Sequence, residues 1–473
     1  MTIAWLYAMP ADFASISGTN LPGLGTWRRL FGIPAVGRDV WGGGYRVGLQ
    51  SSLAVAGLAY TVFCASVVRG ARVSSGWAWG LGLPLLAVVG VILPPVLSTD
   101  VFAYVGYARM PLVHGLNPHL TTQMELVRLG DVTAPFLRWP IASPYGPLWT
   151  LWCMTLVVLF PVDSVAGVVM ALKMCGVLAC VGLALGLRAW VVASSRRQSA
   201  DGSAETTRVA NASASQALGS TVVALVLFNP LLLLEGPGSA HNDLPMMAFL
   251  MAGLCATRVG RFRFGALLLG IAGGLKILPL LLLPALLLRR RGQPRQVLEV
   301  LTFGMLPVVL AYLPFWEGLS TFAGLSQRWQ HEGGAAAARV ATAAATWGRL
   351  ASTVLPIVVV YVACLARLWQ AQRARPTAFV PDDALTLDLW TFTALAVFLL
   401  ATGIWFPWYL VWLWPGALVA LLAWPPGASD REPGVDAKSP WLSVAKGLPR
   451  LLAGVGLWLV TALLLATYTL APG

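Results

Sequence analysis

Apolar runs of about 20 residues recur along almost the whole chain, and they restrict its fold more than any single motif does. A helix of that length crosses a hydrocarbon core of roughly 30 Å, and helices can span lipid because they satisfy their own backbone hydrogen bonds. The sequence therefore predicts an all-α polytopic membrane protein with about 11–13 transmembrane helices. The clearest runs are 49–68, 77–97, 165–192, 218–234, 264–288, 297–315, 347–369, 385–404, 408–424 and 451–470.

The formal net charge of the 473-residue chain is +13, and its basic residues gather in short connections between the apolar runs. Such clusters mark the cytoplasmic connections of membrane proteins, so the charge indicates topology and gives no support to nucleic-acid binding. Examples are residues 196–197, 258–263 and 289–291. Residues 194–215 are rich in Ser, Ala and Thr, and this composition predicts a flexible cytoplasmic loop.

Residues 98–119, STDVFAYVGYARMPLVHGLNPH, follow an apolar run and place many polar side chains at a membrane boundary. Ionisable groups there cost free energy and are usually functional. Asp100, at the water end of the preceding helix, can act as a general base that takes a proton from a hydroxyl. A hydrated carboxylate at a helix end is the plainer alternative. Tyr104, Asn117 and His119 are expected at the rim of the same site.

Residues 143–147, SPYGP, open an apolar run at 148–160 that is too short for an ordinary membrane crossing. A helix of this length suits a segment that lies in the membrane interface or dips into it. We expect Tyr145, from this segment, to contact a sugar or an acceptor.

A second polar group lies in residues 236–243, GPGSAHND. Gly and Pro interrupt the backbone here, so His241, Asn242 and Asp243 are predicted at the start of the next helix, where unpaired N–H groups attract anions. An N-cap followed by a turn would explain Asn242 or Asp243. It would leave His241 without a role, which favours a functional site.

Lys276 stands in a predicted break of the apolar run 264–288. A lysine can reach water from such a position without any further role. Positive side chains that converge on one side can instead bind a phosphate. Arg328, Arg339 and Arg349 lie in or beside a long polar segment on the side where Lys276 is expected, so we include them as candidates.

The segment 405–409, WFPWY, precedes another apolar run on the same side. Trp408 and Tyr409 offer large apolar faces and one hydroxyl, which suits the wall of a sugar or isoprenoid site. Trp412 and Trp414 are expected in the belt of aromatic residues at the membrane interface.

The order of these motifs resembles that of the bacterial polyprenyl-phosphomannose-dependent α-1,6-mannosyltransferases, which belong to the GT-C class of membrane glycosyltransferases. The motifs are DVFAY, HGLNPH, SPYGPLW, FNP followed by AHND, a lysine in a split helix, and WFPWYLVW, and the similarity covers residues from about 78 to 425. The chain then divides into a tail at 1–48, a GT-C-like transmembrane catalytic domain at 49–425 with outer loops at 98–164 and 316–346, and a loop and last helix at 426–473.

The resemblance implies a mannosyl donor carried on polyprenyl phosphate and a hydroxyl of a glycan or glycolipid as the acceptor. Asp100 would be the base, and attack opposite the leaving phosphate would invert a β-linked donor into an α-1,6-type linkage. Lys276, His241 and an outer-loop arginine would meet the phosphate charge. The resemblance also implies a bacterial plasma membrane protein with an extracytoplasmic site, and it implies no nucleotide, metal or other cofactor.

Two alternatives stay open. A transporter or flippase for lipid-linked sugars could use the same lysine and aromatic residues, but it has no need of an acid placed on a hydroxyl. A related transferase could take another polyprenyl-phosphate sugar, such as glucose or arabinose. Motifs of the form GxxxxGK[ST] and HExxH are missing from the sequence, and His114, His119 and His241 have no evident fourth metal ligand.

Overall fold

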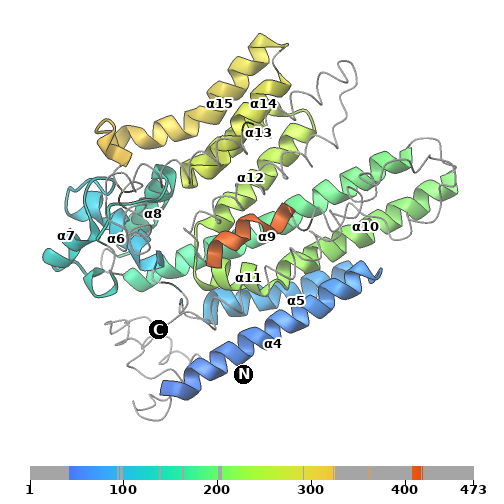
Figure 1. Cartoon of the computed structure of the whole chain (residues 1–473), viewed down its shortest axis with the longest axis horizontal. Coiled ribbons are helices and arrows are strands. Elements are labelled where there is room, and N and C mark those ends of the chain that lie inside the picture. Colours follow the sequence, from blue (N-terminus) through green and yellow to red (C-terminus); the bar gives the residue numbers. More distant parts are fainter. Residues whose placement is uncertain are drawn as a thin grey trace, which may run out of the picture.

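The computed structural model describes residues 42–322, except for 93–94, 96–97, 99, 138–139, 162–163, 201–204 and 291, and it also describes 324, 327, 362, 407–416 and 418. Every named element in these residues is a helix (Figure 1). In chain order they are α4 (Gly42–Val68), α5 (Ser75–Ala87), η2 (Val88–Ile92), α6 (Asp100–Val113), α7 (Gln123–Arg128), η3 (Ala134–Phe136), α8 (Pro147–Leu159), α9 (Val165–Ala200), α10 (Glu205–Leu227), α11 (Pro230–Leu233), η4 (Leu234–Gly238), α12 (Asp243–Arg258), α13 (Phe262–Leu275), η5 (Leu278–Leu282), α14 (Leu283–Arg289), α15 (Pro294–Tyr312), η6 (Leu313–Phe315), η7 (Ser320–Phe322) and η8 (Pro407–Trp412).

Three helical stretches of the described residues are long and apolar enough to cross a membrane: Ser75–Ile92, Val165–Ala193 and Pro294–Phe315. A bent pair, Ala212–Leu227 with Pro230–Gly238, would be a fourth span, with an angle of 54° between its two helices. These stretches confirm the predicted all-α polytopic membrane protein. The predicted total of about 11–13 spans also concerns parts of the chain outside the described residues and stays a prediction.

The long helices pack side by side in one series, with α9 near its middle (Figure 1). Helix α9 has α10 on one side and α12 on the other, and α5 follows beyond α10. In the other direction α13 packs on α12, and α15 packs on α13. The shorter helices α6, α7 and α8 lie together at one end of the long helices (Figure 1).

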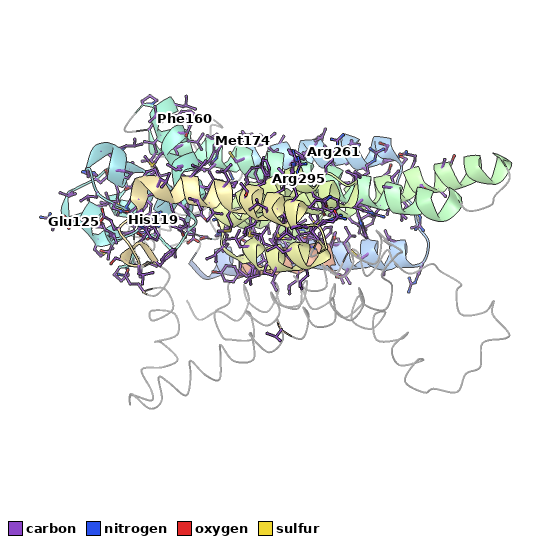
Figure 2. The ribbon with its side chains drawn as sticks, turned by 90° about the horizontal axis from the view of Figure 1, so that it is seen from above. His119, Glu125, Phe160, Met174, Arg261 and Arg295 are labelled. Carbon is purple, nitrogen blue, oxygen red and sulfur yellow. The ribbon has the colours of Figure 1, made fainter. Side chains whose placement is uncertain are left out.

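Basic connections gather away from the end that carries α6 to α8. Arg258 Nη1, at the end of α12, donates to Trp190 O of α9 at 3.1 Å. Arg263, at the start of α13, pairs with Glu299 near the start of α15. Figure 2 shows Arg261 well separated from the end that carries His119 and Glu125. One end of the bundle therefore carries the basic connections, and the other end carries α6 to α8.

The bend between α10 and α11 occurs at Asn229 and Pro230. Proline lacks an N–H and is tolerated in the first turn of a helix, and Asn229 Oδ1 accepts the N–H groups of Leu231 and Leu232 at 2.9 and 3.2 Å. Asn229 Nδ2 also donates to the Tyr60 hydroxyl of α4 at 3.2 Å. The break is thus held by side chains, and it directs the chain into η4.

The prediction of a flexible loop at 194–215 is wrong. Helix α9 continues to Ala200 and α10 begins at Glu205. Between 194 and 215 the sequence contains no proline and a single glycine, Gly202. Its Ala, Arg, Gln and Glu residues favour helix, so polarity alone was a poor guide to the local structure.

The predicted short helix after SPYGP is α8, and its first turn lies directly against the end of α13. Gly146 N donates to Leu275 O at 3.1 Å. A Cβ atom on Gly146 would lie 2.1 Å from Gly274 O, so only glycine allows this approach of two backbones. The contact fixes α8 beside Lys276, the residue that follows α13. The placement of α8 in the membrane interface stays a prediction.

We expect Gly146→Ala to lower stability by about 1–3 kcal/mol, because the added methyl group must push the two backbones apart. The melting temperature of the detergent-purified protein measures this change. Gly80→Ala is the matched control, since a Cβ there meets no atom within 4 Å and alanine favours helix. Equal melting temperatures for Gly146→Ala and the wild type would show that this contact is not needed.

Candidate active site

Asp100 begins α6 and is almost completely buried, with 6% of its surface exposed. The expected position at the water end of the preceding helix is therefore corrected, and the alternative of a hydrated carboxylate does not hold: the carboxylate lies inside the molecule at the start of the next helix, where the helix dipole favours negative charge. Tyr145 donates its hydroxyl to Asp100 Oδ2 at 3.0 Å. The structure thus joins two residues predicted from separate motifs.

His241 lies between two carboxylates. Its Nδ1 is 3.8 Å from Asp100 Oδ2, and its Nε2 is 3.4 Å from Glu235 Oε2. All three side chains are buried. A carboxylate therefore faces each ring nitrogen at ion-pair distance, and His241 separates Asp100 from Glu235. Glu235 was not predicted, because nothing in its local sequence distinguishes it from a helix-end carboxylate.

The backbone before His241 closes in a helix C-terminal motif. Ala240 N donates to Gly236 O at 2.7 Å, and His241 N donates to Glu235 O at 3.0 Å. Ala240 has φ 58°, the left-handed conformation that this motif requires. An alanine there costs on the order of 1–2 kcal/mol. The position of His241 is therefore maintained at the expense of local backbone strain.

Lys173, in the third turn of α9, is completely buried and supports the same segment. Its Nζ donates to Pro237 O at 2.8 Å, to Gly238 O at 2.7 Å and to Val89 O at 3.3 Å. An ammonium group has three N–H donors, and each finds a carbonyl oxygen. Lys173 thus ties η4 to both α9 and η2, and sequence reasoning missed it because its partners are distant in the chain.

Lys276 lies in the predicted helix break, directly after α13, beside a second carboxylate. Its Nζ is 2.6 Å from Asp243 Oδ1. The same Nζ lies 4.4 Å from the ring centroid of Tyr409 and 4.8 Å from that of Trp412. The two rings stack on each other at 4.3 Å. Lysine and aromatic faces at these distances attract one another.

Trp412 was expected in an aromatic belt, and this expectation is corrected. Its side chain is 5% exposed, and its indole Nε1 donates to Asp243 Oδ1. A buried indole N–H needs an acceptor, and Asp243 supplies it. Trp412 therefore belongs to the group around Lys276.

Asn242 connects the two carboxylate groups. Its backbone N–H is 3.5 Å from the Tyr104 hydroxyl, and its Nδ2 donates to Leu275 O at 3.2 Å. As the residue before α12, it was a candidate N-cap, yet its side chain caps no N–H group. Among the described residues, Asn242 Oδ1 and Asp243 Oδ2 are buried acceptors without a hydrogen-bond donor.

Asn117 and His119 form a neighbouring group. Asn117 Nδ2 donates to Phe315 O at 2.9 Å, and Asn117 Oδ1 accepts the His119 N–H at 3.0 Å. Burial lowers the pKa of His119 to about 4, so its imidazole is neutral at physiological pH. Within the described residues, neither side chain hydrogen-bonds to Asp100.

The other residues predicted for the site lie wholly or partly outside the described part of the structure. Arg328, Arg339 and Arg349 lie outside the described residues. Trp408 lies in η8, whose backbone is described, but its side chain lies outside the described part. The described site therefore consists of the Asp100 group and the Lys276 group.

The apolar helices indicate a polytopic membrane protein. The residues around Asp100 and those around Lys276 form a polar site beside a helix break. A family model described as alpha-(1->6)-mannopyranosyltransferase, N-terminal domain, matches residues 46–291. The chain belongs to this family of glycosyltransferases, as its motifs suggested. The matched residues include Asp100, His241 and Lys276, whereas Tyr409 and Trp412 follow them.

A curated relative, alpha-(1->6)-mannopyranosyltransferase A of Mycobacterium tuberculosis (strain ATCC 25618 / H37Rv), is 27% identical over 243 residues. These residues are 50% of this chain and 42% of the relative, so the match spans less than half of that protein. No solved structure matches the chain.

We expect Lys173→Met to destabilise the protein strongly, because it removes the donor from two buried carbonyl oxygens, at about 1–3 kcal/mol each, and from the part-buried Val89 O. Thermal melting in detergent measures the loss. Met174→Leu, at the next position of α9, is the control, since such a swap conserves volume and costs less than about 1.5 kcal/mol. If Lys173→Met had the same melting temperature as Met174→Leu, Lys173 would not be needed to hold η4 in place.

Proposed function

We propose that the protein is an inverting mannosyltransferase that moves mannose from a polyprenyl-phosphate donor to a hydroxyl of a glycan or glycolipid, forming an α-1,6-type linkage. The observation that carries the proposal is that a buried carboxylate, Asp100, and the half-buried Lys276 with its partner Asp243 lie in one site, where Tyr104 interacts with both carboxylates. Family membership supports the reaction class.

In the proposed reaction, the acceptor oxygen forms a bond to the anomeric carbon while the bond from that carbon to the phosphate oxygen breaks. The acceptor proton passes to Asp100. Tyr145 and His241 both contact Oδ2 of this carboxylate, and we propose that Oδ1 receives the proton. We propose that His241 orients the base, in addition to the phosphate contact expected from the sequence.

The leaving group becomes a phosphate monoester and gains one negative charge. Preformed positive groups stabilise such charge better than water does. Lys276 is the candidate in the described residues, and Arg328, Arg339 and Arg349 are further candidates. The rings of Tyr409 and Trp412 hold the lysine ammonium in place.

Sugar hydroxyl groups need acceptors, and Asn242 Oδ1 and Asp243 Oδ2 are two buried acceptors without a donor. Leaving such groups unpaired costs about 1–3 kcal/mol each, which a bound sugar would recover. We propose that this pair contacts the sugar. Tyr104, Asn117, His119 and Trp408 complete the proposed sugar and acceptor contacts.

The proposed site opens on the extracytoplasmic side of a bacterial plasma membrane. Support comes from the basic residues at the ends of α9, α12 and α14, which lie away from α6 to α8. Basic connections favour the cytoplasm, so the Asp100 end would face outward. A donor with its lipid tail in the bilayer could enter there.

We expect Asp100→Asn to lower turnover by about 10²–10⁴-fold, because an amide cannot take the acceptor proton. Transfer from synthetic polyprenyl-phosphate mannose to a short oligosaccharide, with linkage analysis of the product, measures the change. Donor binding should persist. The control Glu125→Gln makes the same acid-to-amide change at an exposed ion pair of α7.

Full transferase activity in Asp100→Asn would remove Asp100 from the mechanism. A purified protein that moved the lipid across vesicles with or without the substitution, and transferred no sugar, would support the flippase alternative. Transfer of glucose or arabinose in preference to mannose would support the alternative donor.

We also propose that turnover requires no metal ion. Activity should be unchanged after treatment with excess EDTA and dialysis, because the positive charge at the phosphate comes from side chains. A rate that falls with EDTA and returns with Mg²⁺ or Mn²⁺ would contradict the mechanism. The intact melting temperature of the EDTA-treated protein is the control for loss of fold.

A further inference from the structure

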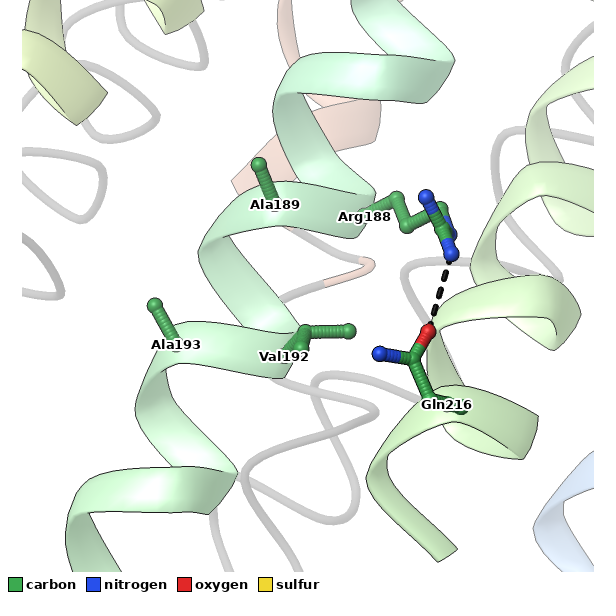
Figure 3. A pocket seen from close by; sticks show the side chains of 5 residues that line it. All are labelled: Arg188, Ala189, Val192, Ala193 and Gln216. Carbon is green, nitrogen blue, oxygen red and sulfur yellow. Dashed lines mark hydrogen bonds between the residues drawn. The ribbon is translucent and has the colours of Figure 1, made fainter. Parts of the chain in front are cut away.

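A cavity of about 400 Å³ lies between α9 and α10, away from the carboxylate groups. It is lined by Arg188, Ala189, Val192, Ala193 and Gln216 (Figure 3). This volume lies within the range of small-ligand sites. Its lining combines one guanidinium and one amide with small apolar side chains, and the proposed reaction uses none of them.

Arg188 is held in the cavity by a neutral partner. Its Nη2 donates to Gln216 Oε1 at 2.9 Å (Figure 3). Its Nε is buried without a hydrogen-bond acceptor among the described residues, and none of their carboxylates pairs with its guanidinium. The positive charge is therefore not compensated by the described protein, and an N–H donor remains unsatisfied.

The close approach of α9 to α10 beside the cavity depends on Gly219 of α10. A Cβ atom there would lie 2.7 Å from Val192 Cγ2 and 3.1 Å from Arg188 Cγ. The glycine lets the stem of Arg188 lie against α10, so that its guanidinium reaches Gln216. The arginine is thus oriented by packing and by a hydrogen bond.

The cavity lies at the level expected for lipid headgroups. The candidate span of α9 ends at Ala193, within two turns of Arg188. Along α9, Arg188 is about 22 Å beyond Lys173 at 1.5 Å per residue, so it lies far from the η4 segment. It is close to Trp190, whose carbonyl accepts a hydrogen bond from Arg258 at the basic end of the bundle.

We propose that this cavity binds the phosphate group of an anionic phospholipid from the leaflet at the basic end. Guanidinium groups bind phosphate oxygens through their N–H donors, and the guanidinium of Arg188 lines the cavity with an amide and no described carboxylate as its partner. Ala189, Val192 and Ala193 supply the apolar surface for the upper part of an acyl chain. The negative net charge of the lipid compensates Arg188.

An arginine that only extends toward water would keep its donors solvated. Arg188 does not fit this description, because its Nε is buried and its guanidinium is held by Gln216. Basic pockets between membrane helices at the cytoplasmic side recur as sites for anionic lipids. The geometry and the position therefore favour the same ligand.

The test is native mass spectrometry of the full-length protein in detergent, with phosphatidylglycerol or phosphatidylcholine of identical acyl chains. The wild type should retain phosphatidylglycerol in preference to phosphatidylcholine. Arg188→Met should reduce bound phosphatidylglycerol on the order of fivefold, the effect of one basic residue near an anionic surface. Arg261→Met is the matched control, because Arg261 is an exposed arginine at the same end, and its loss should leave binding unchanged.

Gln216→Glu provides a second variant of nearly the same shape, in which a carboxylate compensates Arg188 and repels the phosphate. It should show a similar loss without unfolding. Unchanged phosphatidylglycerol binding in this variant, or equal losses in Arg188→Met and Arg261→Met, would overturn the proposal. Displacement of the lipid by millimolar inorganic phosphate would assign the cavity to a soluble anion and would also overturn it.

Discussion

Residues 229–242 depart from regular α-helical hydrogen bonding inside an apolar bundle, and the rest of the structure depends on how their polar groups are satisfied. Asn229 caps α11, and Lys173 donates to the carbonyls of Pro237 and Gly238. In a lipid-like interior each unpaired peptide group costs several kcal/mol. An irregular segment persists there only where neighbouring groups meet this requirement. The buried lysine of α9 thus permits the loop on which half of the proposed site is built.

The same scarcity of water explains why the ionisable groups of the site are arranged in sets. An isolated buried charge is costly, whereas a compensated one is tolerated. Asp243 lies beside Lys276, and His241 lies between Asp100 and Glu235. Between the two sets, the Asn242 N–H lies 3.5 Å from the Tyr104 hydroxyl, and Tyr104 packs edge-on against Tyr145, which donates to Asp100. Packed aromatic rings therefore separate the two sets at short range.

Local features of this protein were predictable from the sequence, and distant contacts were not. Glycine and proline determine breaks locally, so the break at Lys276 and the helix that begins at Asp243 were found correctly. Trp412 was misplaced because its acceptor, Asp243, lies 169 positions away. Glu235 was missed for a different reason: nothing in its local sequence distinguishes it from a helix-end carboxylate, and no composition rule indicates the left-handed turn at Ala240 that precedes its partner His241. Polarity also misled the prediction for 194–215, where backbone preference for helix prevailed.

Helix α9 shows how the choice between lysine and arginine follows from the surroundings. Lys173 meets three carbonyl oxygens from two segments, and a compact ammonium with three rotatable donors suits acceptors that lie in different directions. Arg188 meets one amide oxygen and an open cavity, where a planar fork can hold the amide with one edge and present another edge to an anion. An arginine at 173 would not fit the space between the carbonyls without moving η4. A lysine at 188 would keep the charge and lose the paired geometry. One helix therefore carries a structural cation toward one end and a recognition cation toward the other.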